Sequence, residues 1–384
     1  MKIVLNAIIA KRNGGGATQI VYNYLKATLS DADIEWYYIV SEEFVEFIRE
    51  DVGVDSDHWL VLPRQPQVRT YFKAKKSISH FLDTIRPDLV YSILAPSYFG
   101  FKYTEVMRCC NAWDVIDSND EAFSFIDKKT RRRFRLKTWL VRRLMKRADY
   151  FITQTQVAKD GIAKVTGKEK ERIAVVPNVL PLFFQSITPR IIETEGINIL
   201  YVASPSPHKN LTIIPQVAKI LKEEYKVDNF KFLVTIPSKV AGVSAQILEE
   251  AKSLNVEETI LNVGGKSQKD LVELYESATI GFFPSVLETF SATLLEYMYF
   301  NLPIVSSDKP FNKEVIGDAA LYFEATNAKE AASAIFQIIS NVSLKESLII
   351  KTKEQIKSYL DYKQHYISTT EFFKKIVNEE NNKY

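Results

Sequence analysis

The sequence predicts an α/β protein built from two doubly wound domains, and three observations favour this fold class. The chain has 384 residues, more than one hydrophobic core usually supports, so two domains of about 180 residues each are expected. Short apolar segments, rich in β-branched and aromatic residues, alternate with amphipathic segments of helix length through both halves. Because these apolar segments are continuous, we expect parallel strands covered by helices on both faces.

The predicted strands fall into two groups. In the first half they are segments 2–9, 34–40, 88–94, 149–155 and 173–178, and in the second half they are segments 197–203, 230–236, 278–284, 302–308 and 320–323. Segment 180–196 carries two prolines and no clean period, which is typical of a linker. We therefore place the first domain at 1–182, completed by a C-terminal helix at 362–384, and the second domain at 190–361.

Composition excludes several classes of protein. The chain is 46% hydrophobic and 25% charged, as ordinary soluble domains are. Cys109 and Cys110 are adjacent, which suits neither a disulfide framework nor a zinc site. The N-terminal apolar run from Ile3 to Ala10 is a better first strand than a signal peptide, and no stretch approaches the ~20 apolar residues of a membrane span. We expect a cytoplasmic protein.

Ligands of doubly wound sheets bind beyond the carboxyl ends of the strands, where helix N-termini offer unpaired N–H groups. The first such loop contains three consecutive glycines, among them Gly15 and Gly16, before a predicted helix. Glycine lets the backbone approach a ligand closely. The spacing is not G-x-G-x-x-G, so the dinucleotide fingerprint is absent. A simple turn explains these glycines equally well.

The loop after the first strand of the second half contains Lys209 and Asn210, where the next helix is expected to start. A cation at the positive end of a helix dipole is unfavourable, and a bound phosphate would remove the conflict. The alternative is an exposed lysine extended into solvent. A histidine such as the neighbouring His208 is more often a surface or capping residue than a catalytic one.

One carboxylate lies just before the helix predicted after strand 278–284, and a second lies within that helix. Glu288 lies in the loop, followed by the backbone N–H groups of Thr289, Phe290 and Ser291, which could bind a phosphate or hydroxyl. Glu296 lies within the helix among apolar neighbours, where a carboxylate must reach water or a hydrogen-bonding partner. The hydroxyls of a ribose would suit it. The alternative is a strand, loop and helix with two glutamates placed by chance.

The segment around these glutamates reads FPS-x-x-E-x-F-S-x-x-x-L-E-Y-M-x-x-N-L-P-I-V. It resembles the E-x7-E motif of retaining, nucleotide-sugar-dependent glycosyltransferases of family four (group 1), which have the GT-B fold of two Rossmann-like domains separated by a cleft. The resemblance extends upstream through HKNL at 208–211, NVGG at 262–265 and DLVELYESATIGFFPS at 270–285. It covers nearly all of the second domain and is weaker in the first.

The resemblance implies a role for each loop in binding the donor. Glu288 would contact the donor sugar, the amides of Thr289, Phe290 and Ser291 would hold its hydroxyls or phosphate, and Glu296 would bind the ribose. Lys209 would bind the diphosphate and stabilise the leaving group. The remaining residues implied in donor binding are glycines of two loops: Gly15 and Gly16 closing over the diphosphate, and Gly264 and Gly265 bordering the base.

Two positions depart from the family pattern. Ser204 stands where the family has an arginine for the phosphates, so His208 or Asn210 would have to replace it in part. Asp114 stands where many members have a histidine near the donor sugar, and it is our candidate for a third catalytic residue beside Glu288 and Lys209.

No metal is expected. A nucleoside diphosphate leaving group is weakly basic, and amides, a helix end and a lysine can neutralise its developing charge. No Asp-x-Asp motif ends a predicted strand. We expect no cofactor beyond the nucleotide-sugar co-substrate, and retention of anomeric configuration follows from the resemblance.

Segment 128–147 concentrates eleven cations and no acid, although the whole chain carries only +3. As a helix it would have a broad apolar face, expected to pack inward, formed by Phe134, Leu136, Leu140, Val141, Leu144 and Met145. The opposite face would carry Lys128, Arg131, Arg132, Arg135, Arg142, Arg143 and Lys146, with Trp139 among them. A solvated helix face is one interpretation. We favour docking on an anionic membrane surface, towards a lipid-linked acceptor; no motif supports binding of nucleic acid.

The sequence therefore predicts a hexosyl-type glycosyltransferase on the inner face of the cell membrane. Its acceptor would be a glycan or a lipid-linked glycan, and the reaction would belong to the assembly of capsule or lipopolysaccharide. A catalytically weak GT-B scaffold is the main alternative, motivated by Ser204 and the absent histidine. A sugar-nucleotide epimerase is another, disfavoured because it needs buried general acid and base groups and the chain has only four histidines.

Overall fold

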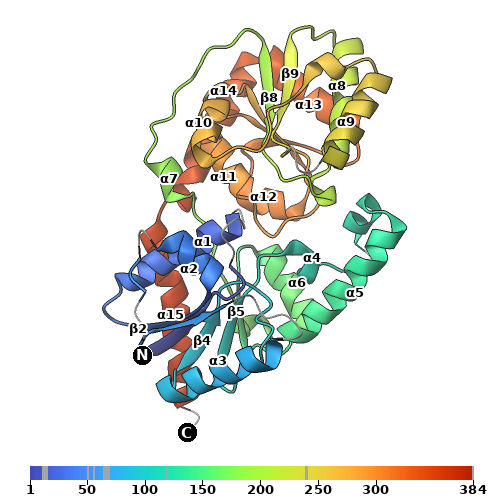
Figure 1. Ribbon diagram of the computed structural model, residues 1–384. Coiled ribbons are helices and arrows are strands. Elements are labelled where there is room, and N and C mark those ends of the chain that lie inside the picture. The colour runs from blue at the N-terminus through green and yellow to red at the C-terminus, as the bar shows by residue number, and fades with distance from the viewer. Residues whose placement is uncertain are drawn as a thin grey trace. The chain divides into compact units, whose positions relative to one another are not determined.

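The computed structural model describes residues 1–10, 16–49, 52–54, 57–63, 70–117, 120–237 and 241–382. The chain forms two compact units, each an α/β domain (Figure 1). Unit one contains Met1–Asp117, Arg132–Pro177 and Lys363–Tyr384, and unit two contains Ser118–Arg131 and Asn178–Tyr362. The predicted fold class, with two parallel sheets, is confirmed.

Unit one has a seven-stranded parallel sheet in the order β3-β2-β1-β4-β5-β6-β7. Its strands are β1 (Lys2–Asn6), β2 (Glu35–Ser41), β3 (Trp59–Leu62), β4 (Leu89–Ser92), β5 (Glu105–Arg108), β6 (Tyr150–Thr153) and β7 (Ile173–Val175). Both faces of the sheet are covered, because Ile3 and Leu5 belong to one apolar cluster and Val4 to another. The alternation follows from the period of two in a strand.

The helices of unit one flank this sheet (Figure 1). They are α1 (Gly16–Leu29), α2 (Glu42–Ile48), α3 (Tyr71–Ile85), α4 (Ala112–Val115), α5 (Lys128–Met145), α6 (Gln156–Thr166) and α15 (Tyr362–Asn381). The C-terminal helix α15 packs on the first domain's sheet, where Phe373 contacts Tyr91 and Trp36 with ring centroids 4.9 and 6.5 Å apart.

Unit two has a six-stranded parallel sheet in the order β10-β9-β8-β11-β12-β13. Its strands are β8 (Ile197–Tyr201), β9 (Phe230–Val234), β10 (Ile260–Asn262), β11 (Ile280–Phe283), β12 (Ile304–Ser307) and β13 (Ala320–Phe323). Its helices are α7 (Leu182–Gln185), α8 (Ile214–Glu223), α9 (Ala241–Ser253), α10 (Gln268–Glu276), α11 (Ala292–Tyr299), α12 (Pro310–Ile316), α13 (Ala328–Ser340) and α14 (Val342–Ile356). The predicted linker 180–196 contains α7.

Helix α11 is fixed tightly to the strands beneath it. Tyr297 donates a hydrogen bond to the carbonyl of Leu200 at 2.8 Å and accepts one from the N–H of Val202 at 3.2 Å. Its ring passes so close to Gly281 of β11 that a β-carbon there would lie 2.6 Å from the ring. Glycine at 281 therefore allows α11 to reach its position, and with it Glu296.

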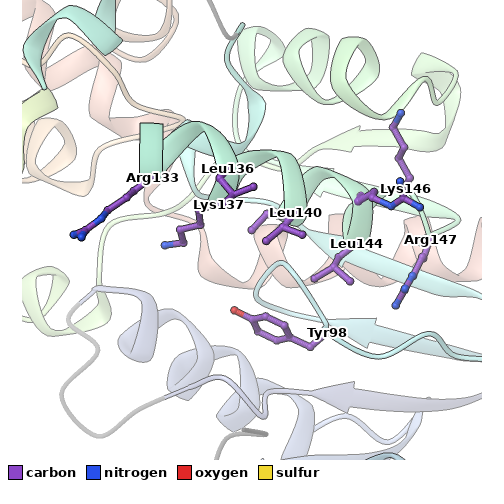
Figure 2. A pocket seen from close by; sticks show the side chains of 10 residues that line it. Tyr98, Arg133, Leu136, Lys137, Leu140, Leu144, Lys146 and Arg147 are labelled. Carbon is purple, nitrogen blue, oxygen red and sulfur yellow. The ribbon is translucent and has the colours of Figure 1, made fainter. Parts of the chain in front are cut away.

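The orientation expected for segment 128–147 is wrong in one respect. Val141 and Met145 of α5 enter the core, but Leu136 and Leu140 are 61% and 50% exposed. Arg142, expected on the outer face, turns inward and donates to the carbonyls of Asp114 and Ile116. Figure 2 shows the leucines projecting from one side of α5 toward Tyr98. Sequence periodicity could not anticipate a helix rotated by an arginine that binds backbone carbonyls.

Candidate active site

The carboxyl ends of β8, β11 and β12 bring three loops of unit two together, because these strands are neighbours in the sheet. The loop after β8 carries His208, Lys209 and Asn210. The loop after β11 carries Glu288, and the loop after β12 carries Lys309. The residues predicted to bind the donor in the second domain lie in the loops after β8, β10 and β11 or, for Glu296, in the helix α11 (Ala292–Tyr299) that follows β11.

Lys209 and Glu288 form an ion pair, although 79 residues separate them in sequence. Their side chains are only 14% and 12% exposed. Ser285 donates a hydrogen bond to the same carboxylate at 2.8 Å. Lys209 ends the 3₁₀ turn Pro207–Lys209, and Asn210 is the N-cap of a second 3₁₀ turn, Leu211–Ile213, which leads directly into α8 at Ile214. The charge of Lys209 is balanced by Glu288.

Neither residue beside Lys209 supplies a second positive charge. Burial, with the nearby Lys209 cation, lowers the pKa of His208 to about 4, although Glu288 acts in the opposite direction. The imidazole is therefore neutral at pH 7. Asn210 has a left-handed backbone, with φ of 53°. Its amide donates to the carbonyls of Pro284 and Ala325 at 3.3 and 2.7 Å, which holds the loops together.

Backbone donors gather where the loop after β11 enters α11. Within the described residues, no acceptor receives the backbone N–H of Phe290 or of Ser291, the N-cap. The first N–H groups of α11 itself also lack intrahelical partners, as at every helix start. Thr289 is buried in the same loop. These amides and the helix dipole suit an anion or hydroxyl beside Glu288.

Glu296 is buried within α11 and accepts a hydrogen bond from the hydroxyl of Tyr275 on α10. Burial raises the pKa of Glu296 to about 7, although the Tyr275 hydrogen bond opposes this shift. A buried carboxylate needs hydrogen-bonding partners, and Tyr275, 21 residues upstream, supplies one of them. This side chain was not anticipated, because nothing in the spacing connects α10 with α11.

The loop after β10 is shaped by Asn262. Its side-chain oxygen accepts from the N–H groups of Ile236 and Gly264, each at 3.0 Å. Gly264 has a positive φ of 77°, and a β-carbon on Gly265 would lie 3.2 Å from Pro237. The two glycines therefore let this loop turn back and pass close to the loop after β9.

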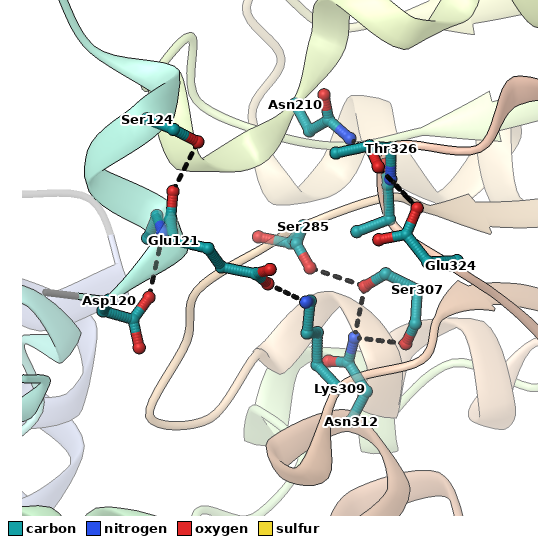
Figure 3. Close-up of polar contacts among 12 residues, drawn as sticks. Asp120, Glu121, Ser124, Asn210, Ser285, Ser307, Lys309, Asn312, Glu324 and Thr326 are labelled. Carbon is teal, nitrogen blue, oxygen red and sulfur yellow. Dashed lines mark hydrogen bonds and ion pairs between the residues drawn. The ribbon is translucent and has the colours of Figure 1, made fainter.

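A second ion pair, not predicted, lies at the end of β12 (Figure 3). Lys309, 15% exposed, pairs with Glu121 of the turn Glu121–Phe125, which belongs to unit two. The hydroxyl of Ser307 donates to the carbonyl of Ser285 at 2.5 Å and accepts from Asn312 at 2.9 Å. These bonds connect the Lys309 loop to the Glu288 loop. The only available signal was a lysine at the end of a predicted strand.

The remaining predicted site residues belong to unit one. Asp114 lies in α4, where burial raises its pKa to about 6 against the opposing hydrogen bond from Asn111 at 2.7 Å. Its Oδ1 has no hydrogen-bond partner among the described residues. Gly16 is the first residue of α1, and Gly15 lies outside the described residues. Among the described parts of the chain, no group of three metal-ligating side chains is present, and the absence of a metal stays a prediction.

Comparison with known proteins agrees with this architecture. Residues 14–183 match the family model Glycosyltransferase Family 4, and residues 187–355 match Glycosyl transferases group 1. The structure superposes on Anabaena Alr3699/HepE in complex with UDP-glucose with a TM-score of 0.71, 14% identity, and 98% and 100% coverage of the two chains. The chain has the GT-B fold of glycosyltransferases.

Two more proteins are similar to this chain over part or all of its length. The O-antigen chain mannosyltransferase RfbU of Salmonella typhimurium is 26% identical over 201 residues, 52% of this chain and 54% of RfbU. The chain thus matches about half the length of that relative. The lipopolysaccharide outer core galactosyltransferase WaaB has a TM-score of 0.65 at 14% identity, covering 97% of this chain and 99% of WaaB.

Proposed function

We propose that this GT-B protein transfers a sugar from a nucleoside diphosphate donor to a glycan, with retention of anomeric configuration. The observation that carries the proposal is the Lys209–Glu288 pair beside the backbone donors of Phe290 and Ser291. A diphosphate placed on these amides brings negative charge to Lys209. Glu288 is then released to accept hydrogen bonds from the donor sugar.

The chemistry follows from where charge develops. As the bond to the leaving group breaks, negative charge grows on the diphosphate, and Lys209 with the α11 amides stabilises it without a metal. These groups are held in place before the donor arrives, by Ser285, Asn210 and the Tyr297 anchor of α11. Preorganised donors of this kind lower the barrier because they need little reorientation during the reaction.

Glu296 would bind the ribose of the donor. Tyr275 orients the carboxylate, and hydroxyl donors from a ribose would stabilise its charged form, which burial disfavours in the free protein. Gly264 and Gly265 would border the base, and Gly15 and Gly16 would close over the diphosphate. In unit one, Asp114 would take the place of the family histidine near the sugar.

The acceptor we propose is a lipid-linked glycan in cell-surface polysaccharide assembly, at the inner face of the membrane. Support comes from the relatives named above, which are an O-antigen mannosyltransferase and a lipopolysaccharide galactosyltransferase. A capsule polysaccharide has the same chemistry at the acceptor, so it belongs to the same proposal.

A second candidate function is a GT-B scaffold that binds the donor without transferring it. Ser204 favours it, because it is exposed and supplies no charge where the family has an arginine, and neither His208 nor Asn210 replaces that charge. The two functions are separated by incubating the purified protein with UDP-glucose, UDP-galactose and GDP-mannose. Release of nucleoside diphosphate with transfer to a glycan supports the enzyme, and NMR of the product's anomeric proton tests retention. Binding without turnover of any donor would assign the scaffold.

A further inference from the structure

A groove of about 920 Å³ runs between α5 and the loop that carries Tyr98 (Figure 2). Leu136, Leu140 and Leu144 form its apolar wall. They are spaced by four residues and so share one side of the helix. Five of the ten residues that line the groove are cations, and none is acidic; the cations are Arg133, Lys137, Arg143, Lys146 and Arg147.

The apolar side chains of this face are exposed to an unusual degree. Leu136 and Leu140 are 61% and 50% exposed, and Trp139, which does not line the groove but follows Leu136 by three residues on α5, is 54% exposed. The helix is already anchored to the core of unit one by Val141 and Met145, which pack with Phe151. Leucines that are not needed for folding but form one continuous stripe point to an interaction surface.

The cations along this stripe form no close ion pairs within the described residues. Within the described part of the chain, none of the five groove cations forms an ion pair with an acidic side chain. Elsewhere in the protein exposed lysines do pair, as Lys222 does with Glu258. Arg143 instead lies over the ring of Trp139, 5.6 Å from its centroid. The face therefore combines apolar side chains with cations outside close ion pairs, of which Lys137 and Arg147 act only at longer range on the buried carboxyls of Asp114 and Glu105.

We propose that this face docks on an anionic phospholipid membrane. Leu136, Trp139 and Leu140 would enter the boundary between head groups and acyl chains, and the flanking cations would contact lipid phosphates. An aromatic residue with a polar edge and long cationic side chains are the residues that suit this boundary. Charge complementarity selects the partner, because every charged residue of the groove is positive.

The position of α5 connects docking with transfer. Since α5 leads into β6, its N-terminal end lies toward the carboxyl edge of the sheet of unit one, the edge where parallel sheets bind ligands. A membrane held along α5 would bring the lipid anchor of the acceptor to that edge. This step rests on the proposed function, whereas membrane docking itself rests only on the surface of α5.

The test is flotation of the full chain with vesicles. Binding is expected to vesicles of phosphatidylglycerol and phosphatidylcholine in equal parts, and not to phosphatidylcholine alone. Replacing both leucines, as L136Q/L140Q, should abolish flotation with every cation still present. Replacing two cations, as R133Q/K137Q, should weaken binding about 25-fold, about fivefold for each charge near the surface.

Matched controls come from helices α13 and α14 of unit two. V342Q/I350Q removes two side chains that are 68% and 63% exposed on α14, and K329Q/K353Q removes two exposed cations. Both should float like the wild type. Thermal unfolding should show that L136Q/L140Q stays folded, because the leucines lie outside the core.

Three results would overturn the proposal. The first is flotation of L136Q/L140Q at the wild-type level, and the second is equal binding of the wild-type protein to neutral and anionic vesicles. The third is a wild-type protein that binds no vesicles and forms a dimer, which the L136Q/L140Q substitutions dissociate. The last would assign the face to a second copy of the chain. Donor turnover in solution, measured on the same samples, keeps the two proposals apart. Turnover without flotation refutes docking alone, and flotation without turnover refutes the transferase alone.

Discussion

Replacing Glu288 by glutamine should separate transfer from donor binding. Lys209 would keep its position, but its charge would lose the carboxylate that balances it at 14% exposure. Breaking a fully buried ion pair costs about 3–5 kcal/mol. Glutamine retains an oxygen for Ser285 and Lys209, and both side chains keep some contact with water, so we expect a loss of about 2 kcal/mol in the free energy of unfolding. For a unit of this size that lowers Tm by roughly 4–8 °C.

The same substitution should not weaken the nucleoside diphosphate complex. Glu288 competes with the diphosphate for Lys209, so its neutralisation leaves the affinity for UDP or GDP equal or higher. Transfer should fall by about 10²–10³, the usual loss when one preorganised group at a reacting centre is removed. Calorimetric titration with UDP and GDP, and a nucleoside diphosphate release assay with the active donor, measure the two effects.

The matched control is Lys209→Gln, which should lose both diphosphate affinity and transfer. In the double variant K209Q/E288Q the loss of stability should be smaller than the sum of the two single losses, because neither charge is left alone. Transfer by E288Q within a few-fold of the wild type would refute the reasoning, as would a UDP affinity that falls as far in E288Q as in K209Q.

Three further predictions concern Glu296 of α11 and Gly281 of β11. Glu296→Ala should raise the Kd of UDP or GDP more than it lowers kcat, and unchanged nucleotide binding would reject the ribose assignment. The pKa of Glu296 is raised from 4.5 to about 7, so the folded state holds a proton that the unfolded state releases, and this carboxyl's contribution to stability should fall as pH rises from 4.5 to about 7. Chemical denaturation of Glu296→Gln across this range should show a smaller fall than the wild type; identical curves would contradict the raised pKa. Gly281→Ala should destabilise the protein by about 1–3 kcal/mol, because its β-carbon would meet the Tyr297 ring at 2.6 Å; a denaturation midpoint equal to that of the wild type would contradict the close packing.

The sequence predicted ten of the strands and missed three, which are β3, β5 and β10. Their length is not the reason, because β7, which was predicted, has three residues and β4 has four. β5 begins with Glu105 and ends with Arg108, charged residues that propensity excludes from a buried strand. In the structure Ser92 donates to Glu105 at 2.6 Å, and burial raises the pKa of Glu105 to about 7. Tertiary context of this kind is not visible in a local pattern.

In the candidate active site, too, the sequence predicted some features and missed others. The loops were placed correctly at strand ends, because that follows from the order of strands and helices along the chain. The partners were not predicted, since the Lys209–Glu288 and Glu296–Tyr275 contacts depend on which strands become neighbours. The rotation of α5 was missed for a similar reason, because Arg142 hydrogen-bonds to carbonyls of α4 and of the residue after it.

The central claim is that the Lys209–Glu288 end of unit two activates a nucleotide-sugar donor. The most direct measurement is release of nucleoside diphosphate from UDP-glucose, UDP-galactose and GDP-mannose, by the wild-type protein and by K209Q. We expect turnover of at least one donor by the wild type and its loss in K209Q. Donor binding without any turnover, or turnover that K209Q leaves intact, would contradict the claim.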